Sequence, residues 1–327
     1  MNVQISQIEF FLPETRVTND DLAAENPDWD FKLIEPKTGI RCRHIAGPEE
    51  RASDLAVKAA ERLFEKSGIA RESIDVLLLC TQSPDHILPT TACILQNRLG
   101  LPTSTASFDV NLGCSAFVYG LSVSSAMIES GQAKRVLLLC AETYSKYIAP
   151  SDRASRTVFG DGAAATILEP ATEGKSIGPF VFGTDGAGCN KIIVRETPAD
   201  AHVDEGAPVM PRQRLTLEGA SVFMFTMKRV PECVGAVLEK AGKTMMDVDL
   251  VVFHQASKVV IDNLVRILNL DESKVFRGFR DIGNTVSASI PIALKQAQEQ
   301  NRLCAGQTVL LVGFGVGLSW GACLVQW

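Results

Sequence analysis

The sequence predicts an α/β protein in which helices cover both faces of a sheet. Between the apolar runs lie helical patterns such as residues 53–67, where Ser53 is suited to cap the helix and Gly68 to end it. Because strands alternate with helices in this way, we expect a sheet that is packed on both faces. The apolar runs that predict buried strands are residues 76–80, 136–140, 250–253 and 309–312.

The strand and helix pattern occurs twice along the chain. In each copy a strand comes first, a turn then opens a helix of small residues, and a second strand follows that helix. Cys114 and Asn284 occupy equivalent places in the two copies, so a pseudo-twofold arrangement would bring their helix starts together at the centre. The segments are 74–78, 113–115 and 135–139 in the first copy, and 248–252, 283–285 and 308–312 in the second.

We therefore predict two halves, residues 1–171 and 172–327. The Gly- and Pro-rich stretch 172–190 contains the junction, and the polar stretch 198–211 is expected to form a loop near a pocket mouth. A chain of 327 residues, 46% of them hydrophobic, is long enough to bury two core-forming halves. The net charge of −6 argues against a general surface for nucleic acid or anionic membranes.

The nine cysteines indicate free thiols in a reducing compartment. Their number is odd, they are scattered through apolar segments, and no C-x-x-C pair occurs, which supports neither a zinc site nor a disulfide framework. The first residues lack a basic segment followed by an apolar core, and no apolar stretch reaches membrane-spanning length. We expect a soluble, cytoplasmic protein that holds no metal.

Cys114 is the first candidate for a catalytic residue. It stands between an apolar run and a long helix, where the helix macrodipole and unpaired backbone N–H groups favour a thiolate, so we expect a lowered pKa. The alternative is a small buried residue, since free cysteines are often buried in cores.

His254 and Asn284 strengthen the catalytic interpretation of Cys114. His254 follows an apolar strand, and Asn284 lies in a Gly-polar turn that opens a helix. Taken singly, they could be a core histidine and a turn residue. Active sites of open α/β sheets form at strand ends and helix starts. A thiol, an imidazole and an amide in one pocket suit acyl transfer, in which the thiolate attacks a carbonyl and the donors stabilise an oxyanion or enolate.

Motifs along nearly the whole chain resemble the β-ketoacyl-acyl carrier protein synthase III family. Their order agrees with that of the family, and they extend from residue 38 to the C-terminus. The motifs are Thr38-Gly39-Ile40-Arg41, Gly113-Cys114-Ser115, Phe159-Gly160-Asp161-Gly162-Ala163, His254-Gln255-Ala256, Gly283-Asn284-Thr285 and Gly313-Phe314-Gly315 with Trp320-Gly321.

The resemblance implies a thiolase-like fold, with two pseudo-symmetric βαβαβ-type halves in a layered α-β-α-β-α core. It also implies that Cys114 takes an acyl group from an acyl-CoA, and that His254 and Asn284 assist decarboxylation of malonyl-acyl carrier protein. The backbone N–H groups of Cys114 and of the glycine turn at Val316 would form the oxyanion hole. The product is a 3-ketoacyl-acyl carrier protein, and no metal or redox cofactor is needed.

Recognition of CoA and the carrier protein departs from the family pattern. Leu33 stands where the family commonly has an aromatic residue that stacks on the CoA adenine, and Ser257 replaces an asparagine. Replacement charge could come from Arg266, Lys228 or Arg229, although charged residues of this kind usually form a solvated face. The basic residues expected to bind CoA or the carrier protein are Lys37, Arg41, Arg153 and Lys258.

Two substitutions concern the acyl group. Leu88 aligns where a phenylalanine from the neighbouring subunit caps the acyl pocket in short-chain members, so it could leave room for a longer or branched acyl group. Val316 replaces a small residue and could narrow access to the oxyanion hole. Both changes point toward a distinct acyl or acceptor preference.

Three functions agree with these residues. The first is the decarboxylating condensation of an acyl-CoA primer with malonyl-acyl carrier protein, by an enzyme of the acyltransferase class. The second is an acyltransferase of a specialised pathway that moves the acyl group to a non-malonyl acceptor. The third is a non-catalytic partner subunit, against which the joint presence of Cys114, His254 and Asn284 argues. The family resemblance further implies a homodimer.

Overall fold

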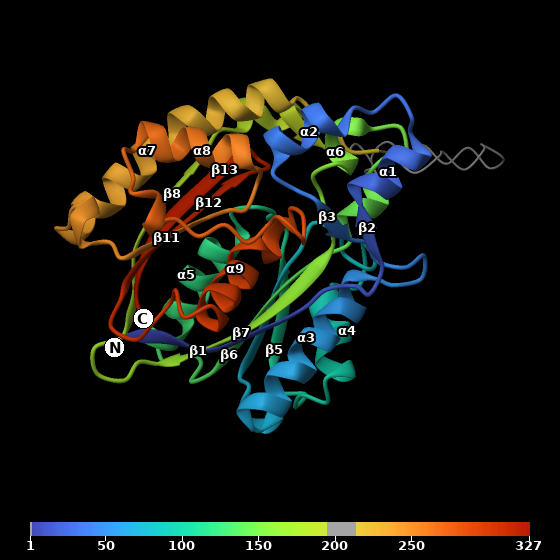
Figure 1. The fold of residues 1–327 in the computed structure, drawn as a ribbon. Helices are drawn as coiled ribbons and strands as arrows, with labels where there is room; N and C mark the ends of the chain where they lie inside the picture. The colour runs from blue at the N-terminus through green and yellow to red at the C-terminus, as the bar shows by residue number, and fades with distance from the viewer. Residues whose placement is uncertain (1, 195–213) are drawn as a thin grey trace.

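The computed structural model describes residues 2–194 and 214–327, and it has the α-β-α-β-α layers that the sequence predicts. Two sheets enclose a central pair of helices, and further helices cover the outer face of each sheet (Figure 1). The predicted polar loop 198–211 lies outside the described residues.

The first sheet has five strands in the order β1-β7-β6-β4-β5. Neighbours β4, β5 and β6 run parallel, whereas β7 is antiparallel to both β6 and β1. All residues of β4 and β6 are buried, as expected for strands that are covered on both faces. The strands are β1 (Val3–Phe11), β4 (Val76–Cys80), β5 (Ala106–Val110), β6 (Val136–Glu142) and β7 (Gly162–Pro170).

The second sheet repeats this topology with one strand fewer. Its order is β11-β12-β13-β8, in which β11 and β12 are parallel and the other pairs are antiparallel. In the first sheet, β5 lies outside β4. At the equivalent place in the second sheet the described residues form only one isolated parallel bridge, between Val251 and Val275. The strands are β8 (Ser176–Thr184), β11 (Leu250–Phe253), β12 (Thr308–Gly315) and β13 (Ser319–Gln326).

Helices α5 (Ala116–Glu129) and α9 (Ser289–Glu299) form the central layer and pack against both sheets. Small residues make this possible, because a Cβ added to Gly120 of α5 would lie only 2.8 Å from Leu138 Cδ1 on β6. The outer layers are α3 (Ala52–Ser67) and α4 (Thr91–Arg98) on the first sheet, and α7 (Gly219–Ala241) and α8 (Lys258–Ile267) on the second.

Shorter elements border the layered core. They include two small sheets that pair β2 with β3 and β9 with β10. None of the described helices is long and apolar enough to cross a membrane. These elements are β2 (Arg16–Thr18), α1 (Asn19–Glu25), α2 (Phe31–Thr38), β3 (Cys42–His44), α6 (Arg153–Arg156), β9 (Ile192–Ile193) and β10 (Thr216–Leu217).

The predicted division between residues 171 and 172 falls between β7, which ends at Pro170, and β8, which begins at Ser176. Both sheets nevertheless contribute side chains to one central hydrophobic cluster. The separation into two domains therefore remains a prediction.

A buried ion pair ties three layers together and gives a stability prediction. Glu9 on β1 bonds Lys295 on α9 at 2.6 Å and Lys66 on α3 at 2.8 Å. Glu9→Ala should lower the free energy of unfolding by about 3 kcal/mol, because it leaves the Lys295 ammonium, whose side chain is only 16% exposed, with a single 4.0 Å contact to Glu299. Lys66, whose side chain is 60% exposed, should contribute under about 1 kcal/mol in Lys66→Ala. Urea unfolding followed by circular dichroism measures both, and equal losses would contradict this account.

Candidate active site

Cys114 lies in the turn between β5 and α5, two residues before the helix begins at Ala116. Its side chain is buried, with 8% of the residue exposed. The cluster around it is mostly apolar and draws on both halves of the chain. The buried members are Tyr144, Ile148, Phe159, Ile192, Leu215, Val286 and Leu318.

The expected lowering of the Cys114 pKa is wrong for the free protein. Burial, assisted by the negative charge of Glu142, raises the pKa of the Cys114 thiol to about 12. Hydrogen bonds from the backbone N–H groups of Cys114 and Val316 act in the opposite direction but are outweighed. The helix start is thus present as predicted, and desolvation of the sulfur is the larger effect.

The end of β12 lies against the Cys114 turn because two glycines leave room for it. A Cβ built on Gly313 would stand 2.7 Å from Ser115 Cα, and one on Gly315 would stand 2.9 Å from Cys114 Sγ. Ser115 Oγ and Ser319 Oγ, 2.7 Å apart, link the two segments beside this contact. The close approach brings Val316 of the second half to the sulfur of the first.

His254 follows β11 and is held as a neutral imidazole. Its backbone N–H donates to Val312 O at 2.7 Å, and the residue is 2% exposed. Burial lowers the pKa of His254 to about 3, so the ring carries no charge near neutral pH.

The hydrogen bonds of Ser289 are compatible with a proton on His254 Nε2. Ser289 Oγ accepts from the backbone N–H of Gln255 at 3.4 Å and lies 2.7 Å from His254 Nδ1. The Ser289 hydroxyl can donate its own hydrogen to Nδ1, and in that tautomer the proton of the neutral ring is on Nε2.

Asn284 presents its amide nitrogen to the same place. Its Oδ1 accepts from the backbone N–H of Val286 at 2.9 Å, so Nδ2 is the group that faces His254 Nε2 at 3.4 Å. With both nitrogens protonated, a single carbonyl oxygen placed between them could accept from both. Val286 has φ of 52°, a strained conformation for a β-branched residue that is typical of functional sites.

The four residues predicted to bind CoA or the carrier protein differ in whether they form ion pairs. Arg41 forms an ion pair with Asp281 at 2.8 Å, and Lys258 forms one with Asp262. No ion pair is found for Lys37 in α2 or Arg153 in α6 with any residue that the structure describes. Lys37 and Arg153 are therefore the members of this set whose charges stay available.

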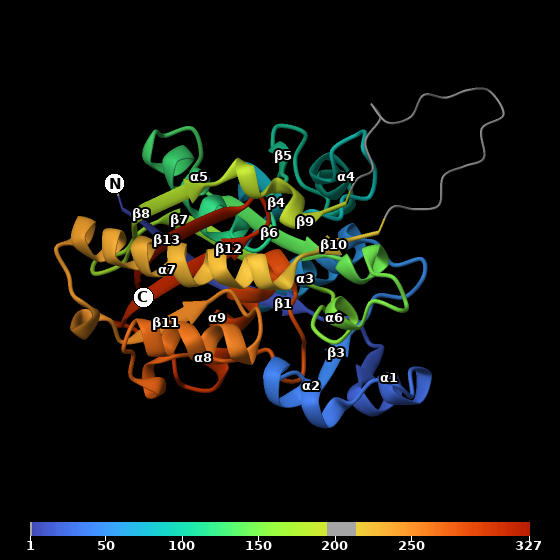
Figure 2. The ribbon, with the colours of Figure 1, turned by 90° about the horizontal axis from the view of Figure 1, so that it is seen from above.

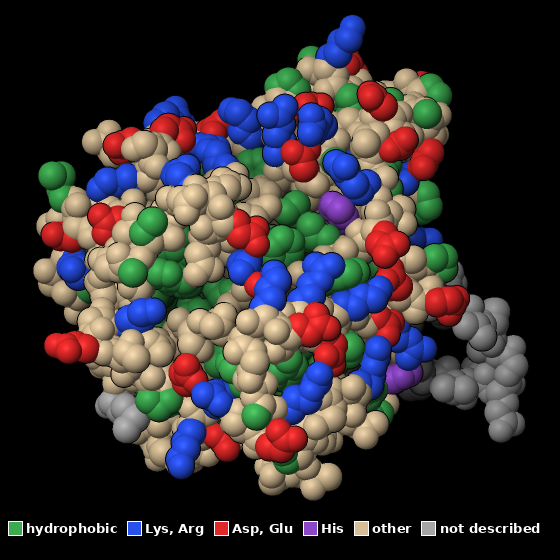
Figure 3. Space-filling model, turned by 60° about the horizontal axis from the view of Figure 1, so that its bottom comes forward, with side chains coloured by type: hydrophobic (Ala, Val, Ile, Leu, Met, Phe, Trp, Pro, Cys, Tyr) green, Lys and Arg blue, Asp and Glu red, His purple; other side chains and the backbone are tan. Residues whose placement is uncertain are grey.

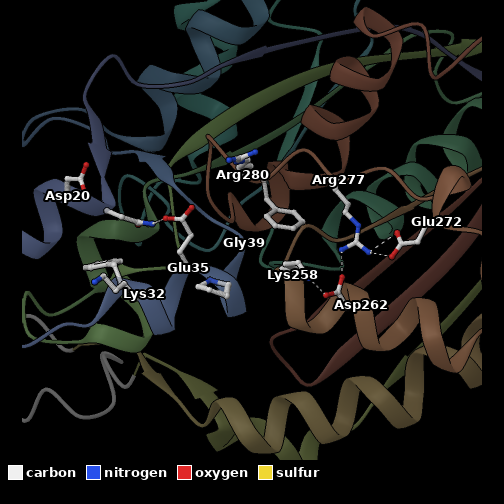
Figure 4. A pocket seen from close by; sticks show the side chains of 13 residues that line it. Asp20, Lys32, Glu35, Gly39, Lys258, Asp262, Glu272, Arg277 and Arg280 are labelled. Atoms are coloured by element: carbon white, nitrogen blue, oxygen red, sulfur yellow. Dashed lines mark hydrogen bonds and ion pairs between the residues drawn. The ribbon is translucent and has the colours of Figure 1, made fainter.

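A cavity of about 850 Å³ lies between α1–α2 and α8. Figure 4 shows Lys258, Asp262, Arg277 and Glu272 in one network on its right-hand side. On the face drawn in Figure 3, Lys and Arg side chains are likewise interspersed with Asp and Glu. The cavity is balanced in charge, with Lys32, Lys258, Arg277 and Arg280 against Asp20, Glu35, Asp262 and Glu272.

Leu88 is 84% exposed on the connection between β4 and α4 and does not reach the Cys114 cluster of its own chain. Among the described residues, no group of three His, Cys, Asp or Glu side chains is placed to hold a metal ion.

The sequence prediction missed Glu142 and Ser289. Glu142 is a fully buried carboxylate at the end of β6, and Ser289 fixes the His254 ring. A lone acid after the apolar run 136–141 was a visible signal, since an unpaired charge in a buried strand is costly. The serine gave none, because it sits among other small residues of a helix start.

Known proteins resemble this chain over its full length. Residues 108–186 and 238–327 match the family descriptions 3-oxoacyl-[acyl-carrier-protein] synthase III and its C-terminal part. A β-ketoacyl-[acyl-carrier-protein] synthase III of Clostridium novyi is 37% identical over 327 residues, which are 100% of this chain and 99% of the relative.

Solved structures agree. A 3-oxoacyl-(acyl-carrier-protein) synthase III superposes with a TM-score of 0.94 at 43% identity, covering 100% of both chains. The priming β-ketosynthase of the R1128 polyketide pathway superposes with a TM-score of 0.90 at 32% identity, covering 99% of this chain and 96% of that one. The chain therefore belongs to the 3-oxoacyl-[acyl-carrier-protein] synthase III family.

Proposed function

We propose that the protein condenses an acyl-CoA primer with malonyl-acyl carrier protein, with loss of carbon dioxide, to give a 3-ketoacyl-acyl carrier protein. The observation that carries this proposal is that Cys114 shares one buried cluster with Val286, whose N–H holds the Asn284 side chain that faces His254. A thiol lies beside the Val316 N–H, and the Nε2 of a neutral His254 lies 3.4 Å from Asn284 Nδ2. The relatives and solved structures named synthase III support the same reaction.

In the first half-reaction the sulfur of Cys114 attacks the thioester carbonyl of the acyl-CoA. The Cys114 S–H and the acyl–SCoA bonds break, a new thioester to Cys114 forms, and the proton leaves with the CoA thiol. The backbone N–H groups of Cys114 and Val316 stabilise the oxyanion, each donor contributing about 3 kcal/mol. Proton transfer must accompany the attack, because burial keeps Cys114 protonated.

In the second half-reaction malonyl-acyl carrier protein takes the place of CoA. His254 Nε2–H and Asn284 Nδ2–H donate to its thioester carbonyl and stabilise the enolate that forms as carbon dioxide leaves. The enolate carbon attacks the acyl-Cys114 carbonyl, and the thiolate of Cys114 is released and takes up a proton. A neutral imidazole suits this role, since donation and not charge is required. These steps need no metal or redox cofactor.

Lys37 and Arg153 are the basic residues that we assign to the CoA phosphates or the acidic carrier. Their charges have no ion-pair partner among the described residues, whereas those of Arg41 and Lys258 are neutralised by Asp281 and Asp262. We also assign the protein to the cytoplasm, because its nine cysteines are free thiols.

A homodimer would explain the exposed edge of the first sheet and exposed hydrophobic side chains of α5 and of the second sheet. Strand β5 lies at the edge of the first sheet and has no strand on its outer side among the described residues, and Figure 2 places it along the same side as α5 and β8. Two hydrophobic side chains of these elements, Val123 of α5 and Phe182 of β8, are 37% and 39% exposed. Pairing of β5 with its copy would cover this edge, and the 84%-exposed Leu88 could then cap the partner's acyl pocket.

Intact mass spectrometry tests the reaction as a whole. Incubation with a panel of acyl-CoAs should add one acyl mass to the wild type and none to Cys114→Ala. Added malonyl-acyl carrier protein should then discharge the acyl group with release of carbon dioxide. Discharge to other acceptors without carbon dioxide would contradict the condensation.

The two half-reactions should separate in variants of the donors. His254→Ala and Asn284→Ala should each slow release of carbon dioxide about 100-fold or more, because each removes one donor to the enolate. Acylation of Cys114 should change less than about threefold in both, since its oxyanion donors are backbone groups. Stopped incubations with labelled acyl-CoA and labelled malonyl-carrier measure the two rates. Equal loss of both would assign these residues to acylation as well.

The raised pKa of Cys114 predicts slow alkylation of the free protein. The second-order rate constant with iodoacetamide should rise about tenfold per pH unit from pH 7 to 10, because the thiolate fraction follows a pKa of about 12. Free cysteine, with a pKa of about 8.5, should level off in the same range. Peptide mass mapping of the Cys114 peptide gives the rate, and a plateau below pH 9 would show that the helix start dominates after all.

A further inference from the structure

Glu142 is a buried acid next to the active site to which the reaction assigns no role. It ends β6 with 0% exposure, and both carboxylate oxygens accept hydrogen bonds. The donors are the backbone N–H of Gln82 at 3.2 Å to each oxygen, Ser83 Oγ at 2.7 Å and Ser287 Oγ at 2.8 Å. Neutral donors, and no cation among the described residues, hold this carboxylate.

These donors come from both halves of the chain. Gln82 and Ser83 follow β4, whereas Ser287 lies in the short helical turn Val286–Ala288 that follows Asn284. Ser287 Oγ also lies 3.3 Å from Cys80 O at the end of β4. The carboxylate thus connects the first sheet to the segment that carries the amide donor.

The turn that Ser287 occupies needs an external hold. Val286 adopts φ of 52°, which costs about 1–3 kcal/mol and persists only when the surroundings impose it. The same residue donates its N–H to Asn284 Oδ1 and so decides that Nδ2 faces His254. Movement of this turn would release the Asn284 amide.

The carboxylate is unfavourable for the first half-reaction. Its charge raises the pKa of Cys114, and burial raises the pKa of Glu142 itself to about 7. A carboxylate that is buried without a cation partner loses its hydration, which costs free energy. A benefit to the second half-reaction would offset the disadvantage.

We propose that Glu142 is a positioning residue for Asn284, which acts by holding Ser287 and so keeping the Val286 turn in the conformation that aims Asn284 Nδ2 at the substrate carbonyl. The inference rests on the proposed function, in which Asn284 serves decarboxylation and not acylation of Cys114. It predicts a selective defect, with acylation preserved and decarboxylation impaired.

Two variants and a matched control test the proposal. Glu142→Gln keeps the shape but turns one acceptor into a donor that faces other donors. Ser287→Ala removes the bond on the Asn284 side, together with the 3.3 Å contact of Ser287 Oγ to Cys80 O. Both should slow release of carbon dioxide from malonyl-carrier at least about tenfold, through kcat and not KM, with acylation changed less than about threefold. Ser83→Ala removes a bond to the same carboxylate on the other side, together with the bond that Ser83 Oγ accepts from the Thr143 backbone N–H, and should leave both rates within about threefold.

The outcomes separate the inference from the function. Parallel loss of acylation and decarboxylation in Ser287→Ala, or the same defect in Ser83→Ala, would overturn the positioning role. Should Glu142→Gln fail to fold, Ser287→Ala against Ser83→Ala decides the matter. A wild type that releases no carbon dioxide, or an Asn284→Ala variant that condenses normally, would instead overturn the proposed function on which the inference rests.

Discussion

The close approach of β12 to the Cys114 turn is the constraint on which the active site depends. The backbone of Gly313 packs against Ser115, and Gly315 leaves no room for a side chain beside Cys114 Sγ. This contact joins the two sheets at the centre of the pseudo-twofold arrangement, where the second half supplies the N–H of Val316 to a sulfur of the first. An alanine at either glycine would need the two segments to move apart, because the nearest atoms are within 3 Å of its Cβ.

Burial at this seam determines the charge state of each group. His254 is kept neutral because desolvation lowers its pKa to about 3, while desolvation raises the pKa of Glu142 to about 7.

The two groups change the stability of the fold with pH in opposite directions. Between pH 6.5, near the pKa of an unfolded histidine, and pH 3, near the pKa of folded His254, the unfolded chain binds one more proton than the folded protein. The stability that neutral His254 allows is therefore lost as pH falls through this range. Between about 4.5, the pKa of an unfolded glutamate, and about 7, the folded state holds the Glu142 proton, so the stability that this proton gives is lost as pH rises. Both side chains are therefore held by hydrogen bonds to neutral groups and not by ion pairs with described residues.

The local patterns of the sequence predicted a sheet covered by helices on both faces, and the internal repeat predicted the central pair of helix starts, whereas the α-β-α-β-α layers were implied by the family resemblance. Apolar runs without alternation indicate strands covered on two faces, and the repeat equates Cys114 with Asn284. It could not predict the reduction of the fifth strand of the second sheet to one bridge, since that depends on pairing and not on composition. The predicted lowering of the Cys114 pKa was wrong because only the helix start can be seen in the sequence. The burial of the sulfur and the nearby charge of Glu142 arise only when distant segments pack together. Ser289 and Ser287 were missed for the same reason, as their partners lie in other segments.

The central claim is that the first half of the chain supplies the nucleophilic thiol, and that both halves supply backbone N–H groups that stabilise the oxyanion formed when this thiol attacks. A crystal structure of the protein acylated by a short-chain acyl-CoA tests it most directly. We predict a thioester to Cys114 Sγ whose carbonyl oxygen lies within about 3 Å of the backbone nitrogens of Cys114 and Val316. The space in front of His254 Nε2 and Asn284 Nδ2 should stay open for the second substrate. An acyl carbonyl that instead pairs with His254 and Asn284, or an acyl group on another residue, would contradict this division of roles.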